Sequence, residues 1–118
     1  MARVVAFVPD LLFGSNVLGA LNGAGHETVL VSDADAVRRE LPGAQALVVD
    51  LTTDPAARIE QVSAIPRAGV KTLAFYSHVE ADVRAQAEQA GFDLVIPRSR
   101  MAREGAAVLA RLLDQGET

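Results

Sequence analysis

The stretch ALVVDLTTDP, residues 46–55, joins a short apolar run to an aspartate and then to the start of a helix. The run Ala46–Val49 is uninterrupted by polar residues, which is typical of a strand buried on both faces. Asp54 is expected to be the N-cap of the helix that follows, because Pro55 suits the first helical position. The stretch therefore predicts a strand, a turn and a helix, with Asp50 at the carboxyl end of the strand.

The same pattern recurs along the whole chain. Short apolar runs predict five strands, at Val4–Val8, Thr28–Val31, Ala46–Val49, Thr72–Tyr76 and Asp93–Ile96. Helical spacing follows each run, with these residues on the inner faces: Val17, Leu18 and Leu21; Val37 and Leu41; Ile59, Val62 and Ile65; Val79, Val83, Ala87 and Ala90; Val108, Leu109, Leu112 and Leu113. Strict alternation predicts a parallel sheet covered by helices on both faces. We expect an α/β, flavodoxin-like three-layer sandwich with strand order 2-1-3-4-5, forming a single domain over residues 1–118.

Composition excludes several classes of function. The net charge of −4 offers no basic surface for nucleic acid. The absence of cysteine excludes disulfides, thiolate metal sites and cysteine catalysis. No apolar stretch approaches the length of a membrane span, and MARVVAF at the N-terminus does not resemble a signal peptide. A cytoplasmic location is therefore expected.

Two aspartates are expected in the crevice where this fold binds ligands. That crevice lies outside the carboxyl ends of strands 1 and 3, where Asp10 and Asp50 emerge. Ser77 follows strand 4 at the same edge. Carboxylates at this point suit Mg²⁺, which is usually held by one or two of them. Asp50 is open to three interpretations: a reactive carboxylate, a cation ligand or a solvated loop residue.

With these residues in place, the chain resembles the receiver domain of bacterial response regulators over essentially its whole length. Asp50 in ALVVDLTT matches the aspartate that accepts a phosphoryl group in that family. Ser77 in LAFYSH matches the hydroxyl residue that contacts the phosphoryl group, and AGFDLVIP is similar to the family's approach to strand 5. The resemblance implies a signalling protein that is not an enzyme, with Ser77 and Tyr76 as switch-like residues.

The departures from the family are equally specific. Receivers have two adjacent acids after strand 1, whereas this chain has Pro9 before Asp10. Receivers end strand 5 with a lysine before proline, whereas here Pro97 occupies the lysine position and Arg98 brings a cation one residue later. The chain thus resembles a divergent, pseudo-receiver branch. We expect weak Mg²⁺ binding or none at Asp10 and Asp50, no other cofactor, and Arg98 as a contact for anions.

In receivers, the face formed by strand 4, helix 4, strand 5 and helix 5 carries the signal to partners. The candidate interface residues on this face are Tyr76, His78, Val79, Arg84 and Arg98. The expected function is a stand-alone receiver-like signalling module that binds a protein partner or forms a homodimer. Whether Asp50 is phosphorylated stays open at this stage.

The alternative is a protein that binds or transforms a small molecule or anion in the crevice between strands 1 and 3. GALNGAGHETVLVSD resembles the first helix and second strand of Rossmann domains, but the G-x-G-x-x-G fingerprint is absent. Each singled-out residue also has a structural interpretation. Asp50 would cap the following loop, Asp10 would cap a helix or turn, and Ser77 and His78 would be turn and surface residues.

Overall fold

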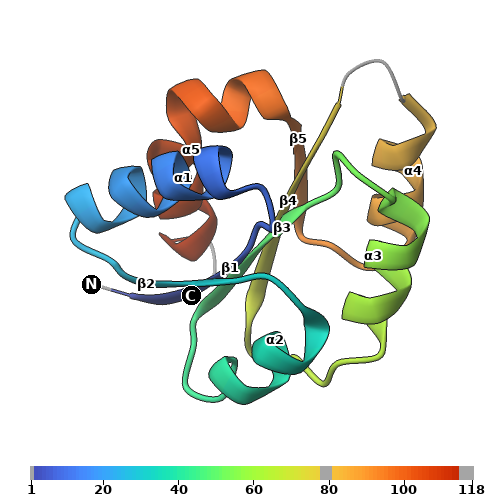
Figure 1. Ribbon diagram of the computed structural model, residues 1–118, viewed down its shortest axis with the longest axis horizontal. Helices are drawn as coiled ribbons and strands as arrows, with labels where there is room; N and C mark the ends of the chain where they lie inside the picture. The colour runs from blue at the N-terminus through green and yellow to red at the C-terminus, as the bar shows by residue number, and fades with distance from the viewer. Residues whose placement is uncertain (1, 78–80, 115–118) are drawn as a thin grey trace.

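The computed structural model describes residues 2–77 and 81–114. Its sheet has five parallel strands in the order β2-β1-β3-β4-β5, and its helices pack on both faces (Figure 1). The strands are β1 Arg3–Phe7, β2 Glu27–Val31, β3 Ala46–Asp50, β4 Lys71–Tyr76 and β5 Leu94–Pro97. The helices are α1 Leu11–Gly23, α2 Ala34–Glu40, α3 Pro55–Ser63, α4 Ala81–Gln89 and α5 Arg98–Asp114. The predicted fold and strand order are confirmed, and each predicted strand end lies within one residue of the observed one.

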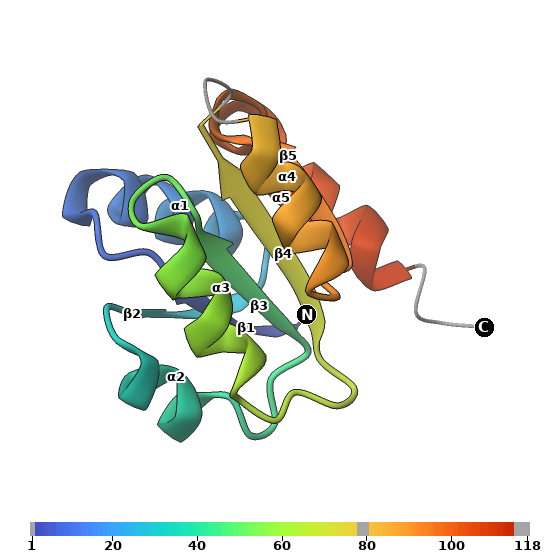
Figure 2. The same cartoon turned by 90° about the vertical axis from the view of Figure 1, so that its right-hand side faces the viewer.

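Alternation of side chains along the strands builds two apolar layers. Val4 and Ala6 of β1 face the layer under α1 and α5, whereas Val5 and Phe7 face the layer under α2, α3 and α4. Both layers are aliphatic for the most part, as expected for a chain with few aromatic residues. Figure 2 shows α3 and α4 lying together in front of the strands. The sheet is thus buried on both faces, which explains its continuous apolar runs.

The inner faces of the helices largely match the predicted sets. Val17, Leu21, Val37, Leu41, Val62, Ile65, Val83, Ala87, Val108, Leu109 and Leu112 are buried, and Leu18, Ile59, Ala90 and Leu113 are partly buried. Val79 lies outside the described residues. Phe13 and Met101 were not predicted as core residues and are buried between α1 and α5. None of the helices in residues 2–77 and 81–114 combines the length and the apolar character needed to cross a membrane.

Helix starts show where local sequence determines structure and where it does not. Asp33 caps α2, since its Oδ1 accepts a hydrogen bond from the backbone N–H of Ala36 at 2.8 Å. Asp54 occupies the predicted N-cap position before Pro55, but its φ of 51° is left-handed and its side chain makes no capping hydrogen bond to the described residues. The predicted position of the N-cap is therefore correct, but the capping hydrogen bond expected from the Asp54 side chain is absent among the described residues. A capping side chain needs an extended backbone at that residue.

Candidate functional site

Parallel pairing brings the carboxyl ends of the strands to one edge of the sheet. Phe7 of β1 is level with Val49 of β3, and Asp50 is level with Phe75 of β4. Asp10, Asp50 and Ser77 therefore leave their strands at the same edge, as the sequence predicted. The loops at this edge hold the candidate site.

Asp50 is buried and is hydrogen-bonded by its own loop. The residue is 4% exposed, and it ends the fully buried strand β3. Its Oδ1 accepts hydrogen bonds from the Thr52 backbone N–H at 2.8 Å and from the Thr52 hydroxyl at 2.6 Å. The carboxylate thus stabilises the turn after β3, the role that the structural interpretation assigned to it.

A cation that the sequence analysis missed lies beside Asp50. Arg58 of α3 donates a hydrogen bond from Nη1 to the backbone carbonyl oxygen of Asp50 at 3.1 Å, and its guanidinium lies 4.4 Å from the centre of the Phe7 ring. Burial lowers the pKa of Arg58, while the carboxylates of Asp50 and Asp54 act in the opposite direction and raise it. An arginine remains protonated despite such a shift, so Arg58 places a permanent positive charge beside the backbone of Asp50. No motif marks Arg58, since its role depends on how α3 packs against β1 and β3.

Asp10 is also engaged by its neighbours. Its Oδ1 accepts a hydrogen bond from the backbone N–H of Phe13 at 3.0 Å, which caps α1. Its Oδ2 lies 3.9 Å from Nη2 of Arg98, in a loose and half-exposed ion pair. Asp10 therefore acts as a helix cap, in agreement with its structural interpretation.

A stack of side chains holds Arg98 in place. The Arg98 guanidinium lies 4.4 Å from the centre of the Phe13 ring. Phe13 in turn packs on Phe75 of β4 with ring centres 5.1 Å apart. A cation over an aromatic face is favourable, so the stack helps to hold Arg98 beside Asp10.

The residues at this edge fit a divalent cation poorly. Mg²⁺ needs oxygen ligands in near-octahedral geometry and usually binds through one or two carboxylates. Asp50 and Asp10 each commit one oxygen to a hydrogen bond, and Arg98 places a positive charge near the second oxygen of Asp10. Within residues 2–77 and 81–114, no group of three or more histidine, aspartate or glutamate side chains is placed to hold a metal ion.

Ser77 and Arg98, two of the predicted site residues, line the same hollow. It has a volume of about 340 Å³ and is bounded by Phe13, Ser77, Arg98, Ser99 and Ala102. A guanidinium and two hydroxyl groups are donors suited to an anion. Asp50 is not among the lining residues.

The predicted interface residues differ in how exposed they are. Arg84 is exposed on α4 and pairs with Glu88 at 3.5 Å, while Arg98 is half-exposed. Tyr76 is 7% exposed and packs in the core cluster with Val83. The structure thus argues against Tyr76 as an interface residue, because its ring fills the core under α4. His78 and Val79 lie outside the described residues.

Comparisons with known proteins identify the fold. No family model matches the chain, and no match was found among curated proteins. Among solved structures, the chain is similar to NtrX from Brucella abortus in complex with ADP, with a TM-score of 0.83 and 18% identity, over 97% of this chain and 26% of that one. The chain thus spans about a quarter of the length of NtrX.

Two further structures match along nearly their whole length. The receiver domain of the Francisella response regulator 1452 matches with a TM-score of 0.83 at 10% identity. The match covers 99% of this chain and 100% of that receiver domain. An atypical orphan response regulator, described as having a phosphorylation-independent regulatory mechanism, has a TM-score of 0.76 at 13% identity over 95% of each chain. At these identities the similarity shows the fold alone, and that fold is the one found in response-regulator receiver domains.

Proposed function

We propose that this chain is a receiver-like signalling module that acts through protein–protein contacts and does not use phosphorylation of Asp50 as its switch. The receiver fold supports the signalling role. One observation carries the rest of the proposal: the carboxylates of Asp50 and Asp10 are both engaged by the chain itself, by Thr52 and by the start of α1. In this proposal the module has no catalytic activity of its own.

The chemistry of phosphoryl transfer explains why these contacts matter. Attack by a carboxylate on a phosphoryl group joins two anions, so it depends on a metal ion or fixed cations to neutralise them. Asp50 is nearly inaccessible, and Pro9 replaces one of the acids that would hold the metal. Pro97 stands where a lysine would reach the phosphoryl group, and Arg98 is drawn toward Phe13 and Asp10. Access to Asp50, the acidic pair for a metal and the lysine position are thus all altered, although Arg58 and Ser77 remain at this edge.

Treatment with a small phosphoryl donor such as acetyl phosphate and Mg²⁺ is expected to leave the mass of the protein unchanged. The reason is the burial of Asp50 and the internal use of both carboxylates. Intact-mass spectrometry measures the result, with an active receiver treated in parallel as a positive control. A gain of one phosphoryl group that Asp50→Asn abolishes would contradict the proposal.

Partner binding is expected to depend on exposed cations rather than on Asp50. Arg84→Ala or Arg98→Ala should weaken binding by about 1 kcal/mol or more if either is an interface anchor, whereas Asp50→Asn should leave it nearly unchanged. The partner is first isolated by pull-down from the source cell, and binding is then titrated with each variant. Arg38→Ala is the matched control, since Arg38 is a similarly exposed arginine on α2. Loss of binding with Asp50→Asn alone would indicate a phosphorylated receiver instead.

The hollow lined by Ser77, Arg98 and Ser99 favours a second candidate function, the binding of a small anion. Arg98→Ala separates the two candidates. If the chain is an anion-binding protein, this variant loses affinity for inorganic phosphate in calorimetry. If it is a signalling module, the same variant loses affinity for the partner, and phosphate binding is negligible in both forms.

A further inference from the structure

The outward face of α1 carries no charge and exposes two leucines. None of the 13 residues of α1 is charged, although 22% of the whole chain is. Leu11 and Leu12 are 78% and 77% exposed, and they are the large hydrophobic residues that the described part of the chain leaves open to solvent. Surface helices ordinarily place charged or polar residues on the side that faces water, whereas the polar residues that α1 exposes, Ser15, Asn16 and Asn22, are all uncharged. An uncharged outward face with two exposed leucines therefore indicates a contact with another protein surface.

Gly19 is not explained by any contact among residues 2–77 and 81–114. Gly14, by comparison, is required by close packing, since a Cβ there would lie 3.1 Å from Cδ1 of Leu30. A Cβ on Gly19 would meet no atom of the described residues within 4 Å, and the backbone there is helical without a positive φ. Glycine in an exposed helix interior is less stable than alanine. Glycine at position 19 therefore carries a cost in helix stability that no contact in the described part of the chain explains.

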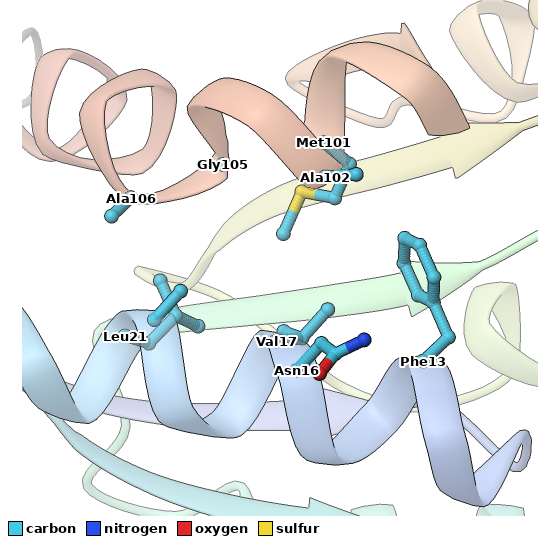
Figure 3. A pocket seen from close by; sticks show the side chains of 9 residues that line it. Phe13, Asn16, Val17, Leu21, Met101, Ala102, Gly105 and Ala106 are labelled. Carbon is cyan, nitrogen blue, oxygen red and sulfur yellow. The ribbon is translucent and has the colours of Figure 1, made fainter.

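An apolar groove runs beside this face, between α1 and α5. Figure 3 shows Phe13, Val17 and Leu21 of α1 directed toward α5, and the Met101 side chain reaching back toward α1. The groove has a volume of about 160 Å³, and Asn16 is the one lining side chain that carries a hydrogen-bonding group. Ala20 of α1 and Ala102 and Ala106 of α5 also line it, so small side chains form part of its wall.

We propose that α1 is a self-association surface, on which two copies of this chain pack their α1 helices antiparallel, with Leu12 of each over Gly19 of the other. Leu12 and Gly19 share one side of the helix, because they are seven positions apart, close to two helical turns. A two-fold axis near residues 15 and 16 then places each leucine opposite the open space of its counterpart. The face is self-complementary, as an isologous dimer requires.

The absence of charge favours a second copy over an unrelated partner. A charged surface docked here would lose hydration with no ion pair to replace it. A second α1 helix is uncharged as well, so no charge is buried and no like charges meet where the two α1 helices touch. The same helix supplies both the protruding Leu12 and the open space at Gly19. Another copy of this chain therefore brings a matching space for Leu12 and a matching leucine for Gly19.

The available area predicts a weak dimer. At 1.5 Å per residue, α1 is about 20 Å long, and α5 beside it widens the face to about 20 Å, because packed helices lie about 8–10 Å apart. The projected area of about 400 Å² per copy lies below the roughly 800 Å² typical of stable complexes. Dimerisation is thus expected to depend on concentration, with a dissociation constant in the micromolar range or above.

Sedimentation velocity over a concentration series tests the proposal on the full chain. The wild type is expected to pass from monomer to dimer as the concentration rises from low micromolar to millimolar. Leu12→Glu is expected to raise the dissociation constant about tenfold or more, because it buries an unpaired charge. Ala57→Glu makes the same change in net charge at an exposed position of α3 and is expected to have no effect. Gly19→Leu should also weaken the dimer while leaving the midpoint of thermal unfolding of the monomer unchanged or higher, a result that a purely structural role for Gly19 excludes.

Cysteine cross-linking tests the antiparallel register, since the chain contains no cysteine of its own. Ser15→Cys lies close to the proposed two-fold axis and is expected to form a disulfide-linked dimer under mild oxidation. The two copies of Gly23→Cys would be about 20 Å apart in this register, beyond disulfide reach, and should react no faster than the control Ala57→Cys. A protein that stays monomeric at every concentration, or a Ser15→Cys variant that cross-links no faster than Ala57→Cys, would overturn the proposal. Equal cross-linking of Ser15→Cys and Gly23→Cys would overturn the antiparallel arrangement.

Discussion

Phe75→Ala is expected to lower the free energy of unfolding by about 3–5 kcal/mol, the range for removing a fully buried aromatic ring. Phe75 is 0% exposed and lies in β4, inside the sheet between β3 and β5. Its ring packs on Phe13, and the guanidinium of Arg98 also lies against the Phe13 ring. The substitution therefore removes core volume and also the support that places a cation at the candidate site.

Urea unfolding followed by circular dichroism measures this loss. Phe75→Leu is the control, because it keeps most of the apolar volume and should cost no more than about 1.5 kcal/mol. If Phe75→Ala and Phe75→Leu cost the same small amount, the ring is not the packing element that the structure indicates. Because small domains are stable by only about 5–15 kcal/mol, the alanine variant is measured at low temperature.

Pro9→Asp is expected to raise the affinity for Mg²⁺ about tenfold. The substitution restores a second acid beside Asp10, and it also restores a backbone N–H that proline lacks. The interaction of a divalent ion with one added carboxylate at about 4 Å in water is worth about 2 kcal/mol, enough for a change of this size. Isothermal titration calorimetry measures both affinities.

The control places the same change at the other end of the sheet. Pro42 is exposed in the turn after α2, and Pro42→Asp adds the same charge far from Asp10 and Asp50. It should leave Mg²⁺ affinity unchanged. The explanation fails if the wild type already binds Mg²⁺ as tightly as a receiver with an intact acidic pair, or if Pro42→Asp raises the affinity as much as Pro9→Asp does.

Some features of this protein follow from short stretches of sequence. Continuous apolar runs such as Ala46–Val49 locate the buried strands, because a strand covered on both faces has no need for polar residues. The N-cap at Asp33 follows from one side chain and the N–H group three residues later. The backbone conformation of Asp54, by contrast, does not follow from the local sequence. The residue types predict the helix start, but they do not predict the left-handed backbone that Asp54 adopts between the turn after β3 and α3.

The side-chain contacts at the candidate site could be found only from the tertiary structure. The stack of Arg98, Phe13 and Phe75 joins three segments that are distant in sequence, and no local pattern predicts their contact. The same holds for Arg58 behind Asp50 and for the burial of Tyr76, which the sequence alone presented as an interface residue. These positions depend on how helices pack against the sheet and not on the residues next to them in the chain.

The amino-acid sequence by itself determined the alternation of strands and helices, the order of the sheet and the edge at which Asp10, Asp50 and Ser77 emerge. Periodicity and end signals are local properties, and parallel sheets with right-handed crossovers admit few arrangements. Only the tertiary structure decided that Asp50 is buried and bonded to Thr52, that Asp10 caps α1 beside Arg98, and that Gly19 has open space on the same side of α1 as the exposed Leu12. Burial, charge pairing and open space are properties of several segments packed together, so they arise only once the chain has folded.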